Sequence, residues 1–145
     1  MITRLLTPED KNRWLVLWAQ YLDFYDVDLP NETTELVWQR ILDKEDALQA
    51  YGAVEGDLLV GCVHYFFHGT TWKTSSYCYL EDLFVDQKQR SKGAGRALIQ
   101  AVKTAAEQKG AAKVYWHTDK QNKTAQALYN KVANLTDFIL YDIPL

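Results

Sequence analysis

The spacing of apolar residues predicts helices in the first third of the chain. A short strand over 2–6 leads to Thr7, which is followed by proline and is typical of a helix start because its hydroxyl can accept a first-turn N–H. Apolar residues then recur at intervals of three and four over 14–25, which predicts one strongly apolar helical face. A second helix is expected over 31–42.

The rest of the chain alternates between strand and helix signals. The expected elements are a hairpin over 48–54 and 58–68, a strand over 77–85, a helix that opens near Ala94 and ends at Gly110, a strand over 113–117, a helix over 122–132 and a last strand over 138–143. Strands clustered in the middle, with helices before and after them, predict a mixed α/β (α+β) fold in which helices pack on a largely antiparallel sheet.

The composition is that of an ordinary globular protein. The 145 residues are 48% hydrophobic and 24% charged, so we expect one domain over 1–145. The longest stretch without a charged residue, 58–72, is shorter than the roughly 20 apolar residues that a membrane span needs. Two cysteines are too few for a disulfide framework, and no Cys/His spacing resembles a zinc site. These features predict a cytoplasmic protein with no membrane partner and no metal.

Charge is distributed unevenly although the sum is small. A net charge of −3 argues against a nucleic-acid partner, since phosphate affinity comes from an excess of Lys and Arg. Residues 21–35 hold five acids and no base, whereas residues 87–96 hold four bases and no acid. The two segments are either two sites of opposite preference or two solvated surface loops.

The most informative stretch runs from a strand through a basic glycine loop into a helix, and it reads LEDLFVDQKQRSKGAGRALIQAV over 80–102. A glycine loop that opens a helix presents free N–H groups and the positive end of the helix dipole, which together bind phosphate. The dinucleotide-binding pattern requires a small residue where Leu98 stands, and the mononucleotide-binding pattern requires a Gly-Lys pair, which the chain lacks. Neither nucleotide-binding fold is therefore expected.

Two short motifs give this loop its context. The loop has the form Arg-x-x-Gly-x-Gly over 90–95, and the helix after the next strand begins Asn-x-x-Ala-x-x-Leu-Tyr over 122–129. With these motifs in this order, the chain resembles the GCN5-related N-acetyltransferase (GNAT) superfamily, and within it the yeast-type histone/polyamine acetyltransferases and the diamine acetyltransferases. The resemblance implies the GNAT acyl-CoA N-acyltransferase fold, with a mixed, mostly antiparallel sheet of six to seven strands and about four helices. It also implies transfer of an acetyl group from acetyl-CoA to a primary amine.

The resemblance further assigns roles in holding acetyl-CoA. A strand backbone would hold the pantetheine arm like an added strand, at Leu83, Phe84 and Val85. The pyrophosphate would lie against the N–H groups of the glycine loop, formed by Arg90, Ser91, Lys92, Gly93, Ala94, Gly95 and Arg96. Asn122 would contact the pantetheine or the loop, and asparagine also suits a helix cap.

The chemistry of the transfer singles out two further residues. An ammonium cannot attack a thioester, so a base must remove a proton, and Glu81 is the candidate, acting through a water. By strict alternation along the strand, Glu81 shares a face with Tyr79 and Leu83, and Asp82 faces the other way. Tyr129 would protonate the departing thiolate, and a backbone N–H near Leu83 would stabilise the oxyanion. The alternatives are that Glu81 is a structural acid and Tyr129 a core tyrosine.

The acidic segment is the candidate acceptor site. In the family, the connection between the first two helices borders the amine, and here it carries Asp23, Tyr25, Asp26 and Asp28. Carboxylates and aromatic faces together suit a cation, so we expect a small cationic amine such as a polyamine as the acceptor. The alternatives are a protein-lysine or histone-tail acetyltransferase, and a non-catalytic acyl-CoA-binding module that regulates a partner.

The C-terminal segment departs from the family pattern, because the chain reads VANLTDF over 132–138 where many members have Leu-Gly-Phe after the tyrosine helix. We therefore expect the last strands to be spaced differently. In the branch that the chain resembles, C-terminal strands pair between subunits, and an unpaired edge near 138–143 would favour a homodimer.

Overall fold

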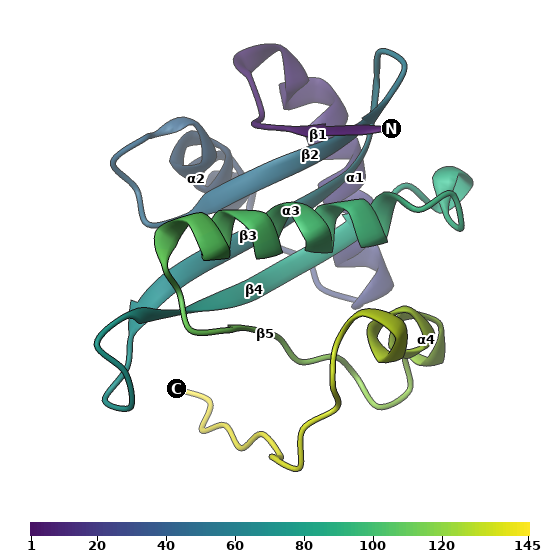
Figure 1. The fold of residues 1–145 in the computed structure, drawn as a ribbon. Helices are drawn as coiled ribbons and strands as arrows, with labels where there is room; N and C mark the ends of the chain where they lie inside the picture. Colours follow the sequence, from purple (N-terminus) through teal and green to yellow (C-terminus); the bar gives the residue numbers. More distant parts are fainter.

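Five strands form one sheet in the computed structural model, which describes all of residues 1–145 (Figure 1). The strands are β1 (Ile2–Arg4), β2 (Gln49–Glu55), β3 (Leu58–Gly69), β4 (Ser76–Val85) and β5 (Val114–Tyr115). They lie side by side in chain order, with β1–β2, β2–β3 and β3–β4 paired antiparallel and β4–β5 paired parallel. The mixed α/β fold is therefore the one that the sequence predicts.

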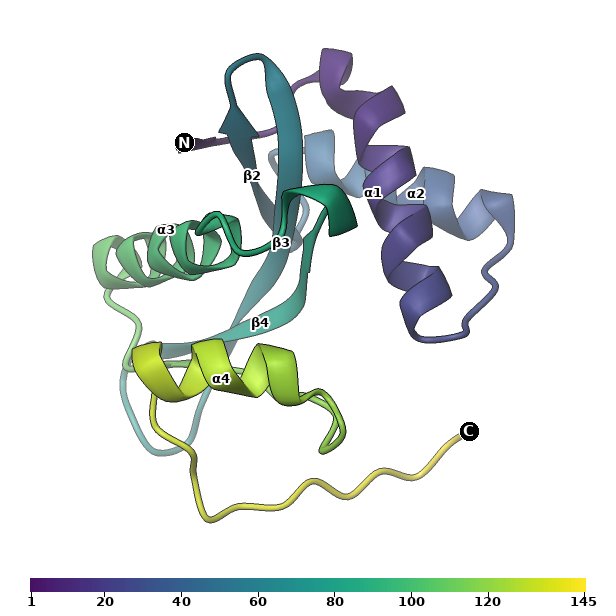
Figure 2. The same cartoon turned by 90° about the vertical axis from the view of Figure 1, so that its right-hand side faces the viewer.

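Helices cover both faces of this sheet. They are α1 (Lys11–Phe24), α2 (Asn31–Leu42), α3 (Ala94–Lys109) and α4 (Lys123–Val132), with two 3-10 turns, η1 (Pro8–Asp10) and η2 (Gln87–Gln89). Figure 2 shows α1 and α2 on one face of the sheet and α3 and α4 on the other, with α4 beside β4. The first predicted helix begins one turn late, because Asp10 accepts the Thr7 backbone N–H at 2.8 Å and holds η1 as a separate turn.

The two faces of the sheet bury different kinds of side chain. Under α3 the core is aliphatic and includes Val60, Val63, Leu98 and Val102. Under α1 and α2 the core is aromatic and includes Trp14, Trp18, Trp38 and Phe84. Both cores pack against β3 and β4, so these two strands are held rigidly from both faces. The end of β4 extends from this rigid part of the sheet.

A bulge at Glu81 interrupts the β3–β4 ladder and corrects the predicted faces of β4. Tyr65 pairs with Leu80 and His64 pairs with Asp82, which leaves Glu81 without a partner on β3. A bulge adds one residue to one strand, so every side chain beyond it changes face.

The packing on either side of the bulge shows this change directly. Leu80 before the bulge and Leu83 after it both pack in the α3 core, although strict alternation would place them on opposite faces. Tyr79 and Leu83 consequently lie on opposite faces. The prediction that Glu81 shares one face with both of them is wrong, because the sequence carries no mark of the inserted residue.

Strands β4 and β5 run together for only two residue pairs. Cys78 pairs with Val114 and Tyr79 pairs with Tyr115, and beyond Tyr79 the strand β4 continues to Val85 without a neighbour on that side. Figure 1 shows β5 diverging from β4, with α4 following below. The backbone groups at the end of β4 are therefore free of the sheet ladder on one side.

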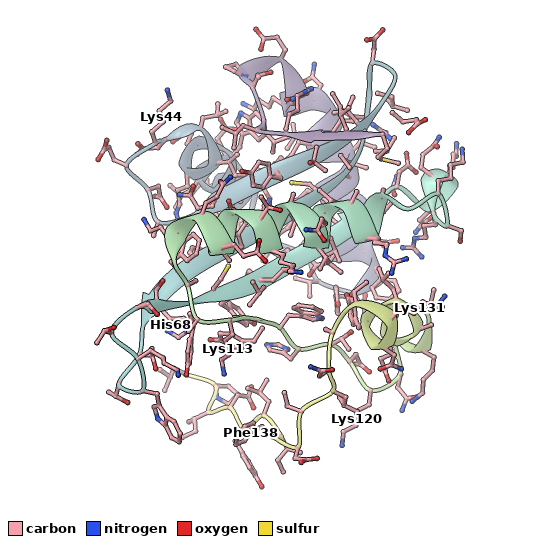
Figure 3. All side chains as sticks on the ribbon, viewed as in Figure 1. Lys44, His68, Lys113, Lys120, Lys131 and Phe138 are labelled. Atoms are coloured by element: carbon pink, nitrogen blue, oxygen red, sulfur yellow. The ribbon has the colours of Figure 1, made fainter.

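The predicted strand over 138–143 does not form, so the sheet has five strands rather than six or seven. Residues after Val132 have no regular structure, and Phe138 is 90% exposed with its ring directed away from the folded body (Figure 3). An apolar segment such as this one becomes a strand only when its N–H and C=O groups meet another strand edge, and no edge of this chain pairs with it. None of the helices has the length and apolar character that crossing a membrane requires.

Candidate active site

A cavity of about 630 Å³, called the main cavity below, opens where β4 ends. Its walls come from four separate parts of the chain: the second half of α1, residues 83–85 of β4, the glycine loop over 90–96, and α4. The sheet ladder is open at this point, so the main cavity lies against free backbone groups of β4. Such a concave site with both apolar and charged walls is the kind that binds an extended small molecule.

Most of the predicted cofactor-binding residues line the main cavity. They are Leu83, Phe84, Val85, Arg90, Ser91, Gly93, Ala94, Gly95, Arg96 and Asn122. Lys92 does not line it, and its ammonium instead donates to Gln89 at 2.9 Å on the surface. Residues that are as far apart in sequence as 83 and 122 thus meet around one cavity.

Asp86 fixes the path of the chain between β4 and the loop. Its carboxylate accepts the Lys88 N–H at 2.9 Å, which caps η2, and pairs with Arg13 of α1. The Lys88 N–H and then Arg13 lower the pKa of this buried carboxyl, so it stays charged at neutral pH. The ion pair therefore ties the start of the loop to α1, which forms another wall of the main cavity.

The loop conformation depends on its glycines. Ser91 and Gly93 both have positive φ values, 65° and 91°, and Gly93 is the residue before α3 begins. An added Cβ at Gly95 would lie 3.2 Å from the Leu128 side chain, so this glycine lets α4 pack closely against the start of α3. The first amides of α3 have no acceptor within the helix and lie at the cavity wall, which makes an anion-binding site.

Two side chains of the second motif border the main cavity from α4. Asn122 caps the helix, because its Oδ1 accepts the Ala125 N–H at 3.2 Å. Tyr129 lies about two turns further along the helix and packs edge-on against Trp116, with ring centroids 5.3 Å apart. Burial, and then the charge of Tyr25, raise the pKa of Tyr129 to about 12. A phenol with that pKa keeps its proton at neutral pH and can donate it.

Glu81 lies on the bulge and not among the residues that line the main cavity. Burial, and then the nearby charge of Asp82, raise the pKa of its carboxyl, while His117 and His64 oppose the rise. A raised pKa makes a carboxylate a stronger base, which suits proton abstraction. The carboxyl is thus partly desolvated, although Glu81 as a whole is a surface residue without a partner on β3.

The four predicted acceptor residues separate into two places. Tyr25 lines the main cavity, where its ring packs edge-on against Tyr21 at 5.1 Å. Asp23, Asp26 and Asp28 line a smaller depression of about 360 Å³ that shares no residue with the main cavity. The acidic segment is thus divided by the end of α1, where the chain turns through a left-handed residue, Asp26.

The sequence reasoning missed the contribution of α1 to the main cavity. Gln20, Tyr21 and Phe24 all line it, and the Arg90 guanidinium lies 5.9 Å from the centre of the Phe24 ring. The signal was present as an apolar helical face, but one face serves both to fill the core and to wall the cavity. The residues of the first half of α1 mainly fill the core and those of the second half mainly line the main cavity, and the sequence does not show where one use ends and the other begins.

Comparison with known proteins agrees with this geometry. The model of the acetyltransferase (GNAT) family matches residues 14–134. D-amino-acid N-acetyltransferase HPA3 of Saccharomyces cerevisiae is 35% identical over 97% of this chain and 89% of its own length. Thialysine N-epsilon-acetyltransferase of Bos taurus is 34% identical over 58% of this chain, and the match spans only 49% of that enzyme. A solved structure of a probable acetyltransferase superposes with a TM-score of 0.88 over 100% of this chain and 98% of its own, at 22% identity, and so shows a shared fold.

The fold and the family match define the class of the protein. The chain belongs to the GNAT family of acetyltransferases and is an N-acetyltransferase that depends on acetyl-CoA.

Proposed function

We propose that the protein transfers the acetyl group of acetyl-CoA to the primary amine of a small cationic acceptor by direct attack. The observation that supports this most strongly is the single cavity bounded by the glycine loop, the open end of β4 and Tyr129. A module that only sensed the cofactor would need the loop, but it would have no use for a partly buried phenol with a raised pKa at the same cavity.

In this proposal the chain holds acetyl-CoA mainly through its backbone. The free N–H and C=O groups of Leu83 to Val85 bind the pantetheine arm, and the first amides of α3 bind the pyrophosphate. Arg90 and Arg96 add positive charge at the same wall. The donor carbonyl then lies near the bulge, at the point where β4 leaves the ladder.

The residues on either side of that point carry out the proton transfers. Glu81 takes a proton from the acceptor ammonium through a water, which frees the nitrogen lone pair to attack the thioester carbon. A backbone N–H near Leu83 stabilises the charge that develops on the carbonyl oxygen. As the carbon–sulfur bond breaks, Tyr129 gives its proton to the thiolate, and the second proton that the attacking nitrogen loses passes through water to restore the phenol.

The acceptor is proposed from charge and from the relatives together. Asp23, Asp26 and Asp28 place three carboxylates beside the end of α1, and Tyr25 places an aromatic face in the main cavity. These groups would attract and orient a cation such as a polyamine. The printed activity of HPA3 favours a second candidate, a D-amino acid, and that of the thialysine enzymes favours a lysine-like side chain.

A panel of amines decides between these acceptors. Thiol release from acetyl-CoA is measured with spermidine, D-amino acids, L-lysine, thialysine and a basic peptide as acceptors. We expect release with one small-molecule class and little with the peptide. Release with the peptide alone would replace the proposal with a protein acetyltransferase. No release with any amine, while acetyl-CoA raises Tm, would replace it with a cofactor-binding module.

A homodimer in the cytoplasm belongs to the same proposal. The C-terminal segment leaves Leu135, Phe138 and Ile143 at least 84% exposed, and β5 is a free sheet edge. An apolar segment beside an open edge favours pairing with a second copy. Sedimentation velocity should show a dimer that becomes a monomer in the double variant Phe138→Asp/Ile143→Asp, and a wild-type monomer at micromolar concentration would contradict this. Both cysteines are buried free thiols, which suits a reducing compartment.

A further inference from the structure

A chain of polar side chains runs through the aromatic core directly below the bulge. His64 on β3 is 1% exposed and packs against the rings of Trp18 and Phe84. Its Nδ1 lies 2.9 Å from Oδ2 of Asp82, and its Nε2 lies 3.4 Å from Nε1 of Trp14. These two contacts therefore connect Trp14, on the buried side of α1, through His64 with Asp82, the residue next to Glu81.

The indole of Trp14 determines which atoms donate and which accept in these two hydrogen bonds. An indole N–H can donate a hydrogen bond but cannot accept one, so Nε2 of His64 must be the acceptor. The proton of the neutral ring then lies on Nδ1, which donates to the Asp82 carboxylate. Trp14 thus selects the tautomer, and His64 holds one oxygen of Asp82.

Asp82 lies between this buried chain and the wall of the main cavity. Its side chain keeps 19% of its surface exposed, whereas His64 keeps 1%. On the side of α1 it faces Tyr21, which lines the main cavity and whose pKa is raised by burial and then by the charge of Asp82. On its own strand it adjoins Glu81, and it pairs with His64 across the β3–β4 ladder while Glu81 has no partner there.

A buried histidine–aspartate pair contributes little to stability. Removing both groups from water costs about as much as their attraction returns, and a well-packed apolar pair would stabilise the core at least as well. A polar chain of this kind inside an aromatic core therefore calls for a function other than stability.

We propose that Asp82 is a second acidic group of the acceptor site and that His64, oriented by Trp14, is a positioning residue that holds the Asp82 carboxylate toward the incoming amine. The proposal rests on the proposed acetyl transfer. Asp82 attracts the ammonium, and Glu81 receives its proton through a water before the nitrogen attacks. The ligand class is a primary ammonium, and its charge is balanced by two neighbouring carboxylates.

A pair of His64 variants separates positioning from packing. His64→Asn places an amide N–H near the position of Nδ1 and so keeps the donor to Asp82, but it leaves unfilled volume. His64→Met fills the volume and removes the donor. Positioning predicts that Asn retains most of the acceptor kcat/KM while Met raises the acceptor KM about tenfold, since hydrogen bonds to charged groups are worth that much. The KM for acetyl-CoA should change less than about twofold in both variants, because His64 does not line the main cavity.

The pH profile gives a readout that a packing role would not move. Asp82 helps to raise the pKa of Glu81, so Asp82→Asn should move the acidic limb of kcat/KM to lower pH. His64 opposes that rise, so His64→Met should move the limb the other way, to higher pH. The charged and titratable groups around the two carboxylates, from every packed element, are His64 and Cys62 on β3, His117 after β5, Tyr79 on β4 and Tyr21 on α1.

Three results would overturn the inference. One is a His64→Met variant at least as active as His64→Asn, which is the order that packing predicts. Another is an unchanged acceptor KM in Asp82→Asn. The third needs no turnover: ¹⁵N NMR of wild-type His64 should show a protonated Nδ1 and an unprotonated Nε2, and the opposite tautomer would remove the positioning chain. If wild-type protein acetylates no amine, the proposed function fails, and this NMR result still decides whether Trp14, His64 and Asp82 are hydrogen-bonded as proposed.

Discussion

The two sides of the site are built in different ways. The proposed cofactor side consists mainly of backbone groups from one stretch, residues 83–96, which line the main cavity together with α4. The proposed acceptor side consists of side chains from α1, β3 and β4, which meet only after folding. A backbone site follows from local turn and helix chemistry, whereas a side-chain site depends on strand register and on how far each helix extends. The predictions below test this contrast, beginning with the largest expected effect.

Tyr129→Phe should lower kcat on the order of 10²- to 10⁴-fold, the range for loss of a general acid. The tyrosine pKa of about 12 means that the wild-type phenol is protonated throughout the neutral range, so its loss should be equally severe from pH 6 to 9. Thiol release measures the rate, and the Tm shift with acetyl-CoA should be retained. Tyr65→Phe, which removes a hydroxyl from a buried core tyrosine, is the control and should be nearly neutral. Unaltered turnover in Tyr129→Phe would remove this residue as the acid.

Glu81→Gln should lower kcat/KM about 10²-fold and abolish the acidic limb of the pH profile. Because the pKa of Glu81 is raised, the wild-type limb should lie above the range of an ordinary glutamate. The same shift affects stability, since the folded state holds this proton more tightly than the unfolded state. Stability is therefore lost as pH rises from the ordinary pKa through the raised one, and Glu81→Gln should have an equal or higher Tm at pH 7. Glu107→Gln, on the exposed face of α3, is the control for activity, and equal rates in both variants would contradict the assignment.

Gly93→Ala should weaken acetyl-CoA binding roughly fivefold to tenfold. Both Gly93 and Gly56 have positive φ with no atom near the added Cβ, and an L residue there costs about 1–2 kcal/mol. Gly56→Ala, in the β2–β3 turn, should therefore lose similar stability by urea unfolding. It should leave the KM for acetyl-CoA unchanged, because Gly56 lies outside the main cavity. Equal effects of the two variants on that KM would mean that the loop backbone does not bind the cofactor.

Neutralising Asp23, Asp26 and Asp28 together should have the smallest effect, a rise of about twofold to fivefold in the KM for a cationic acceptor. These carboxylates are exposed and line a depression apart from the main cavity, so they act at a distance and salt should screen them. The measurement is the acceptor KM at low and at high ionic strength. A matched triple change at Glu45, Asp57 and Glu107 removes the same charge elsewhere. An identical KM in the two triple variants would leave the acidic segment without a role in acceptor binding.

Much of the cofactor side could be predicted from residue order alone. The glycine loop, its helix and Asn122 all line the cavity where the motifs indicate, because each depends on turn geometry and helix capping within a few residues. Lys92 is the exception, since a side chain in a basic run can point either way and this one meets Gln89.

The acceptor side could not be predicted in the same way. The bulge at Glu81 reverses which side chains of β4 face α1, and strict alternation gave the wrong partners. For Asp82 the strand pattern predicted only that it faces away from Glu81, and its contact with His64 does not follow from that pattern. Tyr21 resembled any other core aromatic of an amphipathic helix until its place at the cavity wall was known.

The sequence by itself determined the family, the order of the elements up to residue 132 and the glycine loop that opens α3, because these depend on periodicity and on residues close together in the chain. The tertiary structure decided the register of β3 and β4, the absence of a strand over residues 138–143, and the hydrogen bonds that join Trp14, His64 and Asp82. Each of these depends on which strand edge or side chain is available as a partner. That availability is fixed only when both faces of the sheet are packed.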